Sequence, residues 1–179
     1  AGNSSGATSF NATVDNTAPT ATSSATANGT GTNGLPEAGD KITLVTSQQL
    51  DPNSILSGWG GASTPIVVRI SNAGGAADDF VTFWNSTNTA QLPLGSIDMG
   101  RAGYVNTGAA ITFGASGTAS TLVQATTTMT ITLGTPSATA IRVTATTKLT
   151  WTSSTTPTDL AGNAASGNAV TAATAVRQF

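Results

Sequence analysis

Apolar and polar side chains alternate along most of this chain, in short runs separated by glycine, proline, asparagine and aspartate. In the clearest run, residues 41–45, Ile42 and Leu44 occupy alternate positions. A period of two places successive side chains on opposite faces of a β-strand, so Ile42 and Leu44 are predicted to face a core. Gly39-Asp40 supplies a turn before this strand, and Asp51-Pro52 ends it because proline fixes φ and lacks an N–H.

Similar runs recur at short intervals, and no helical period of 3.6 extends beyond a couple of turns. The pattern predicts an all-β protein of about ten strands, arranged as a Greek-key β-sandwich. Met129, Ile131 and Leu133 are predicted to point inward, and residues 55–61 to form one helical turn that carries Trp59 toward the core. The expected strands cover residues 20–27, 41–45, 64–70, 78–85, 90–100, 104–113, 120–125, 128–134, 140–146, 148–151 and 169–176, with a further strand at 8–14.

Residues 1–17 are predicted to form an N-terminal extension, and residues 18–179 the sandwich domain. Phe10, Ala12 and Val14 fall on one face of a short extended run that precedes Pro19. One interpretation is an ordinary first strand of the sandwich. The other is an intersubunit strand, because an apolar-faced strand joined by small residues can be exchanged between copies.

The composition excludes several classes of function. With 6 basic and 8 acidic residues and a net charge of −2, the chain has no basic stripe for nucleic acid. Histidine and cysteine are both absent, which removes the Ser-His-Asp triad, thiol nucleophiles, thiolate or histidine metal sites, and disulfides. We therefore expect a protein that is not an enzyme.

The same composition indicates where the protein is found. Its uncharged polar residues are mainly Thr, Ser, Asn, Gln and Gly, a bias typical of secreted and cell-surface β-proteins. No apolar run reaches the length of a membrane span, and the first six residues lack the regions of a signal peptide. We expect an extracellular form from which a leader has been removed.

Two motifs carry a resemblance to a known family. Gly39-Asp40 with the following strand and residues 47–55, together with the later run Asp159-Leu160-Ala161-Gly162-Asn163, resemble the bacterial immunoglobulin-like domains of surface-layer and adhesin proteins. Gln48 and Gln49 stand where that family usually carries Glu and Pro. The resemblance implies an extracellular, noncatalytic, modular domain with an immunoglobulin-like sandwich fold.

A few residues are candidates for binding or modification. Asp78 and Asp79 could supply oxygen ligands to calcium, but turn-capping aspartates are the alternative and we expect no cofactor. Trp59 and Trp84 could stack against cell-surface glycans, although single aromatics inside strands more often belong to the core. Asn-x-Ser/Thr triplets, which are possible glycosylation sites, begin at Asn3, Asn11, Asn28 and Asn85.

These observations favour a structural cell-surface protein, a homopolymeric filament resembling a pilus or a surface layer, in which Phe10, Ala12 and Val14 join neighbouring subunits. The alternative hypothesis is an adhesin or a carbohydrate-binding module.

Overall fold

The computed structural model describes residues 2, 14–72, 78–106 and 109–179. Within these ranges the chain forms ten strands, about the number that the alternating pattern predicts, and one short helix, which lies at residues 52–55 and not at the predicted residues 55–61. The strands are β1 (Ala21–Ala27), β2 (Lys41–Thr46), β3 (Thr64–Asn72), β4 (Asp79–Asn85), β5 (Gln91–Asp98), β6 (Ala110–Phe113), β7 (Ser120–Ala125), β8 (Thr128–Thr132), β9 (Thr150–Thr152) and β10 (Ala169–Thr171), and the helix is α1 (Pro52–Ile55).

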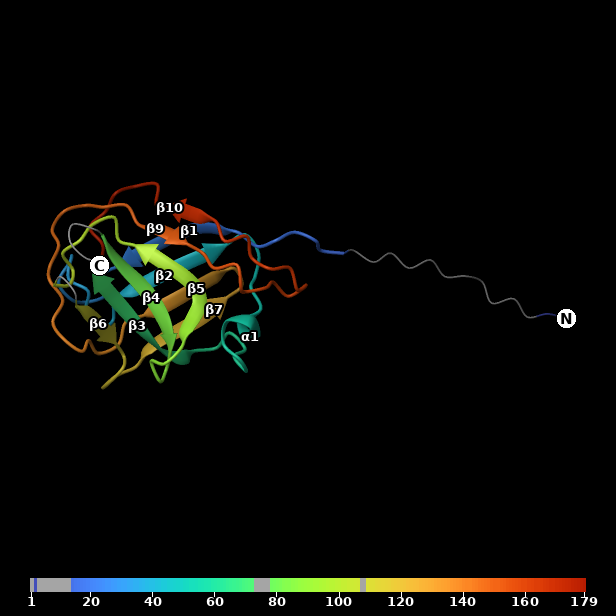
Figure 1. Cartoon of the computed structure of the whole chain (residues 1–179), viewed down its shortest axis with the longest axis horizontal. Coiled ribbons are helices and arrows are strands. Elements are labelled where there is room, and N and C mark those ends of the chain that lie inside the picture. The colour runs from blue at the N-terminus through green and yellow to red at the C-terminus, as the bar shows by residue number, and fades with distance from the viewer. Residues whose placement is uncertain (1, 3–13, 73–77, 107–108) are drawn as a thin grey trace.

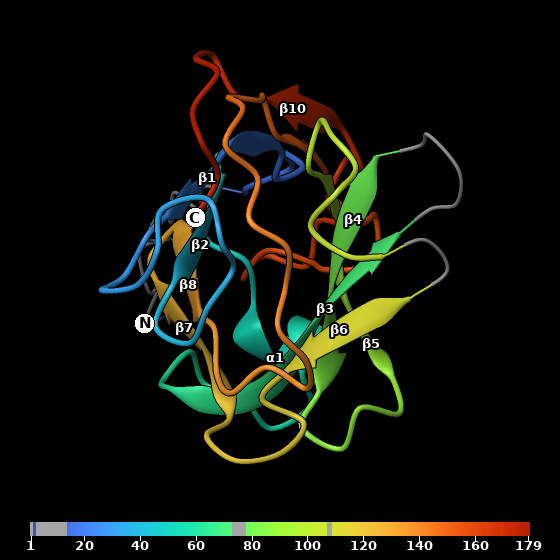
Figure 2. The same ribbon diagram turned by 90° about the vertical axis from the view of Figure 1, so that its left-hand side faces the viewer.

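All strand pairs within the sheet are antiparallel, in the order β1-β2-β8-β7-β3-β4-β5-β9-β10, with β6 beside β3. The first residues of β3 pair with β7 and its later residues pair with β6, so β3 joins two arms of the sheet. Figure 2 shows the arm β1-β2-β8-β7 facing the arm β6-β3-β4-β5. This all-β architecture is consistent with a β-sandwich or a barrel.

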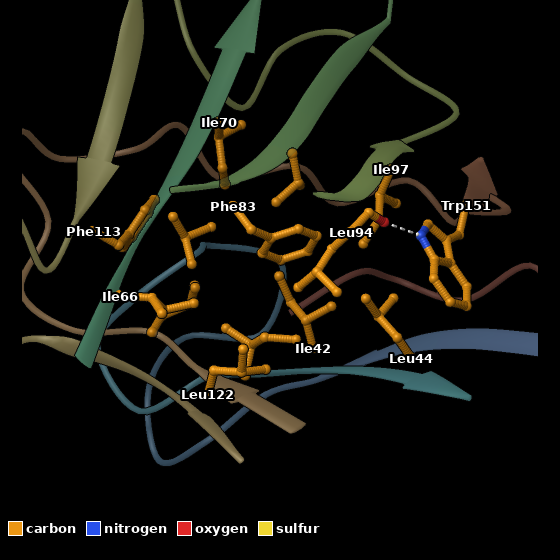
Figure 3. Close-up of a cluster of buried hydrophobic side chains, with 14 of the residues drawn as sticks. Ile42, Leu44, Ile66, Ile70, Phe83, Leu94, Ile97, Phe113, Leu122 and Trp151 are labelled. Atoms are coloured by element: carbon orange, nitrogen blue, oxygen red, sulfur yellow. Dashed lines mark hydrogen bonds between the residues drawn. The ribbon is translucent and has the colours of Figure 1, made fainter. Parts of the chain in front are cut away.

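The core lies between these arms and is built from alternate strand positions. Ile42 and Leu44 of β2 are fully buried, and Met129, Ile131 and Leu133 are buried beside them, as predicted. Across the core, Figure 3 shows Phe83, Leu94 and Ile97 pointing toward the β2 side chains. The other core residues labelled in Figure 3 are Ile66, Ile70, Phe113, Leu122 and Trp151.

Trp151 anchors β9 to the strand beside it. Its side chain is 1% exposed, and its indole N–H donates to the Leu94 carbonyl at 2.8 Å (Figure 3). A buried indole needs such a partner, because an unsatisfied N–H in an apolar environment costs on the order of 1–3 kcal/mol.

The two ends of the sheet order lie close together, and side-chain amides join them. Asn168, just before β10, accepts from the Ala21 N–H at 2.7 Å and donates to the Ala21 carbonyl at 2.9 Å. Further along, Thr26 donates to the fully buried Gln178 at 2.6 Å. We call this line of contact between β1 and residues 168–179 the seam. Since residue 168 lies at the start of β1 and residue 178 near its end, the two segments run in the same direction.

Most of the predicted strands are confirmed, but three parts of the prediction are wrong. Residues 140–146 form no strand, because their N–H groups bond to different elements: Ile141 to Tyr104 and Val143 to Gly34, at 2.8 Å each. The run at Tyr104 is buried but irregular, and the strand begins only at residue 110. The last strand ends at residue 171, where the ladder with β9 stops. Phe10 and Ala12 lie outside the described residues.

Candidate functional site

The two sequence motifs meet at one end of the domain. Leu50 and Asp159 form a β-bridge, and the Asp51 N–H donates to the Thr158 carbonyl at 2.8 Å. Residues 47–51 and 158–163 therefore lie side by side, whereas Gly39-Asp40 precedes β2 and lies against Gly29 and Glu37. We call this region the extension pole and define it by residues 14–19, 47–51 and 158–163.

A short capped helix stabilises this pole through hydrogen bonds. Asp51 is the N-cap of α1: its carboxylate accepts from the Asn53 N–H at 3.0 Å, and Pro52 occupies the first turn. The Ser54 hydroxyl donates to the Asp51 carbonyl at 2.6 Å and accepts from the Thr158 N–H at 3.1 Å. The predicted stop at Asp51-Pro52 is thus a helix start that also ties the two motifs together.

The turn at residues 159–163 is organised by one carboxylate. Asp159 accepts from the N–H groups of Ala161 at 2.9 Å and Asn163 at 2.8 Å, and from the Asn163 side-chain amide at 2.9 Å. The hydrogen bond from the Asn163 side chain is the main reason why the pKa of Asp159 lies below its ordinary value, and backbone donors reinforce it. Gly162 takes φ of 92°, which only glycine adopts readily.

Residues 15–19, which we call the root of the N-terminal extension, are held at this pole by hydrogen bonds. Side-chain amides of Gln48 and Asn163 donate to Asp15, to its carboxylate and its carbonyl respectively, at 3.0 Å each. Pro19 is buried, and its carbonyl accepts from the Ser166 N–H at 3.0 Å. Gln48 therefore contacts the N-terminal extension directly. Figure 1 shows residues 14–19 leaving the domain at the end opposite the C-terminus.

Apolar groups are exposed where the extension leaves. Val14 is 72% exposed and Leu160 is 67% exposed, the two most exposed large apolar side chains among the described residues. A hollow of about 390 Å³ lies here, lined by Asp15, Gln48, Gln49, Asp159, Leu160 and Ala161. Val14 is the only member of the predicted intersubunit strand that the structure describes, and it is free of the core.

The opposite end of the domain carries a second hollow. This groove has a volume of about 350 Å³ and is lined by Leu35, Pro36, Glu37, Pro136, Thr139 and Ala140, among others. We call it the proline groove. Nothing in the alternating pattern indicated it, because its walls come from two loops that are 100 residues apart in the chain.

A buried carboxylate fixes one wall of the proline groove. Asp40 is fully buried and accepts from the N–H groups of Gly29 at 2.7 Å and Glu37 at 2.8 Å. Burial raises the pKa of Asp40 above its ordinary value, while the two backbone donors act in the opposite direction. The sequence predicts Asp40 as a turn residue and as a weak candidate calcium ligand, and in the structure its carboxylate ties together the loop that surrounds Leu35 and Pro36.

The outer face of β1, β2, β8 and β7 carries mostly threonine, alanine and valine side chains and almost no charge. The strand registers place three rows of four side chains on this face, and only Lys41 among them is charged. The rows are Ala27-Lys41-Thr132-Thr121, Ala25-Thr43-Thr130-Val123 and Ser23-Val45-Thr128-Ala125. Such a face offers hydroxyl and methyl groups for packing against another surface without the cost of burying charge.

The aromatic candidates for glycan binding are mostly internal. Trp59 is 8% exposed and its indole N–H donates to the Ala62 carbonyl. Trp84 is half-buried, with the Arg69 guanidinium 3.5 Å above its ring, so one of its faces is already occupied. Tyr104 packs edge-on against Phe179, and burial raises its pKa to about 12. The structure brings none of these rings together on one surface.

The candidate calcium residues serve the local backbone. One oxygen of the fully buried Asp79 accepts from the N–H groups of residues 103, 104 and 105, at 2.7–3.2 Å. Asp78 has a raised pKa, chiefly through burial and then through the neighbouring charge of Asp98. Within the described residues no three acidic side chains are grouped so that they could hold a metal ion. Asp79 thus performs the turn-capping role that was the alternative to calcium.

Two of the four glycosylation candidates lie in the described part of the chain. Asn28 is half-buried and its amide donates to the Gly31 carbonyl at 3.3 Å. The Asn85 side chain closes the β4–β5 connection, because its oxygen accepts from the Thr89 N–H at 2.8 Å and its amide donates to the Thr89 hydroxyl. Asn3 and Asn11 lie outside the described residues.

No helix within the described ranges combines the length and the apolar character needed to cross a bilayer. Comparisons of the chain with protein-family models, with curated proteins and with solved structures find no match. The function therefore has to be inferred from the two poles, the outer face and the N-terminal extension.

Proposed function

We propose that this protein is the subunit of an extracellular, self-assembling filament or surface layer, and that its N-terminal extension joins neighbouring copies. The observation that carries the proposal is the course of residues 14–19. Their root is hydrogen-bonded to the extension pole, yet Val14 is 72% exposed and takes no part in the core of its own domain. A fixed root with a free apolar face is what an exchanged strand requires.

The fold proposed for this function is an immunoglobulin-like Greek-key sandwich of the kind found in bacterial surface-layer and adhesin proteins. The convergence of residues 47–51 with residues 158–163 at one pole supports the resemblance, since both motifs belong to the same structural unit. The antiparallel order, in which β2 pairs with β1 and with the distant β8, supports a Greek-key connection.

The outer face of the β1-β2-β8-β7 arm supports assembly as well. Copies of a chain with a net charge of only −2 repel one another weakly, and this face carries one charged side chain among twelve. Lateral packing of such faces between subunits would leave few charges to desolvate. An extracellular location agrees with the composition of that face.

The proposal is tested by electron microscopy and analytical ultracentrifugation of the full chain over a range of concentrations. Wild-type protein is expected to form ordered polymers, and Phe10→Asp to remain monomeric with an unchanged melting temperature. Burying a phenylalanine side chain is worth roughly 1.5–3 kcal/mol, so its loss should weaken subunit contacts at least about tenfold.

The matched control is Asn11→Asp, which introduces the same charge on the opposite face of the proposed strand and should still polymerise. Wild-type protein that stays monomeric at every concentration would refute the proposal. Equal assembly of Phe10→Asp and wild type would show that this strand does not join the subunits.

A further inference from the structure

The proline groove is a largely apolar recess that no described residue of the chain fills. Pro36 and Pro136 lack a backbone N–H, and Leu35 and Ala140 contribute further apolar surface. Pro36 and Ala140 are themselves buried, whereas Leu35 is half-buried and only partly covered by the core. A groove with these walls suits an apolar or aromatic side chain rather than a charged one.

The groove is held open by hydrogen bonds that do not depend on an occupant. Asp40 fixes Gly29 and Glu37, and the Glu37 carboxylate in turn accepts from the Thr32 N–H. The opposite wall is tied to the sheet, because the Ser137 N–H donates to the carbonyl of Thr112 in β6 at 2.8 Å. A preformed recess loses little conformational entropy when it is filled.

The position of the groove relative to the extension suits a head-to-tail contact. The extension leaves next to the start of β1, at the end of the domain opposite the C-terminus (Figure 1), whereas the loop that follows the end of β1 lines the groove. Phe10 precedes Val14 by four residues, so an extended segment places it at most about 13–14 Å from Val14. Residues 3–13 contain no charged side chain and one large apolar side chain, Phe10. A copy placed beyond the extension pole, with its groove facing that pole, comes within this reach.

We infer that the proline groove is the acceptor site for the N-terminal segment of a second copy, with Phe10 seated between Pro36 and Pro136. This inference rests on the proposed function and adds to it the surface that receives the strand. The contact joins different surfaces on the two partners, so it is heterologous. Such a contact repeats indefinitely unless the rotation between successive copies closes a ring. The resulting assembly is a filament with polarity.

The test uses full-length variants that disable one partner surface at a time. Thr139→Arg fills the groove from an exposed lining position, while Phe10→Asp disables the segment that enters it. Ala138→Arg is the matched control for the groove, because Ala138 is exposed, adjacent and outside the lining. Thr139→Arg and Phe10→Asp should each stay monomeric at concentrations at least tenfold above those at which wild type and Ala138→Arg polymerise.

Mixing the two defective variants distinguishes a failure of the groove assignment from a failure of the proposed function. Phe10→Asp keeps an intact groove and Thr139→Arg keeps an intact segment, so the mixture should form 1:1 dimers that do not grow. If wild type polymerises and Thr139→Arg does so equally, the groove is not the acceptor although the proposed function stands. If wild type never polymerises, the proposed function itself fails. Failure of the mixed variants to dimerise would also overturn the assignment.

Disulfide trapping identifies which copy supplies the occupant. The natural chain has no cysteine, so Asn11→Cys combined with Thr139→Cys keeps Phe10 in place and gives one designed pair per contact. Oxidation of assembled protein should yield a ladder of covalent oligomers on a nonreducing gel. An internal disulfide confined to monomers would show that each extension occupies its own groove, and would refute an intersubunit acceptor.

Discussion

The seam between β1 and the C-terminal segment depends on Asn168, and its removal should lower stability measurably. The Asn168 amide satisfies both the N–H and the carbonyl of Ala21, which is 6% exposed. Each hydrogen bond contributes a net of roughly 0.5–1.5 kcal/mol, so Asn168→Ala should lower the free energy of unfolding by about 1–3 kcal/mol. For a chain of this length that loss corresponds to a fall in Tm of roughly 2–12 °C.

The measurement is denaturant unfolding followed by tryptophan fluorescence, since Trp151 is buried in the core close to the seam. Asn168→Asp sharpens the comparison. Aspartate can still accept from the Ala21 N–H, but it cannot donate to the Ala21 carbonyl and places two acceptors together. We expect it to destabilise the protein at least as much as alanine does.

Asn16→Ala is the matched control, because Asn16 is exposed and its side chain makes no hydrogen bond in the described part of the chain. It should leave the free energy of unfolding within about 0.5 kcal/mol of wild type. If Asn168→Ala also falls within that range, the side-chain bridge does not hold the seam closed. Hydrogen exchange at the Ala21 amide gives an independent check, since its protection should drop in the variant.

Two further substitutions probe the backbone and the pH dependence. Gly34 has φ of 91°, and a Cβ there would meet the Val143 carbonyl, so Gly34→Ala should destabilise by about 1–3 kcal/mol in chemical unfolding; Gly60→Ala, at a position with open space, should be close to neutral, and equal losses would contradict the argument. The folded pKa of Asp159 lies below its ordinary value of 3.8, so its stabilisation is present above that pH and is lost as the pH falls through the lowered pKa. The stability difference between wild type and Asp159→Asn should therefore shrink between about pH 4 and pH 2 in acid titrations, and a constant difference would refute this account.

The sequence predicts the strands well where one face is buried. Ile42 with Leu44, and Met129 with Ile131, alternate because their strands have a core on one side and solvent on the other. The pattern fails at residues 140–146, since their alternation looks the same as that of a strand while their backbone partners lie on separate elements. At these residues the alternation does not predict burial either, because Ile141 is 41% exposed while Ala140 and Val143 are buried. The alternating pattern therefore holds only where backbone pairing makes the run a strand.

The candidate site was predictable only in part, for a related reason. The motifs at 47–51 and 159–163 pointed to the extension pole through their turn residues, which act locally. The seam depends on contacts such as Asn168 to Ala21, which are 147 residues apart and leave no local signature. The proline groove likewise arises from two distant loops that only the folded sheet brings together.

The direction of β1 determines how the domain bears a pull along the axis between its poles. Tension that arrives through residues 14–19 acts along β1, whose six residue pairs with β2 lie side by side from Ala21 to Ala27. The hydrogen bonds of an antiparallel pair stand perpendicular to the strands, so this load shears the pairs together instead of opening them one after another. A chain of such subunits, linked pole to pole, would be loaded in the direction in which its first strand resists most strongly.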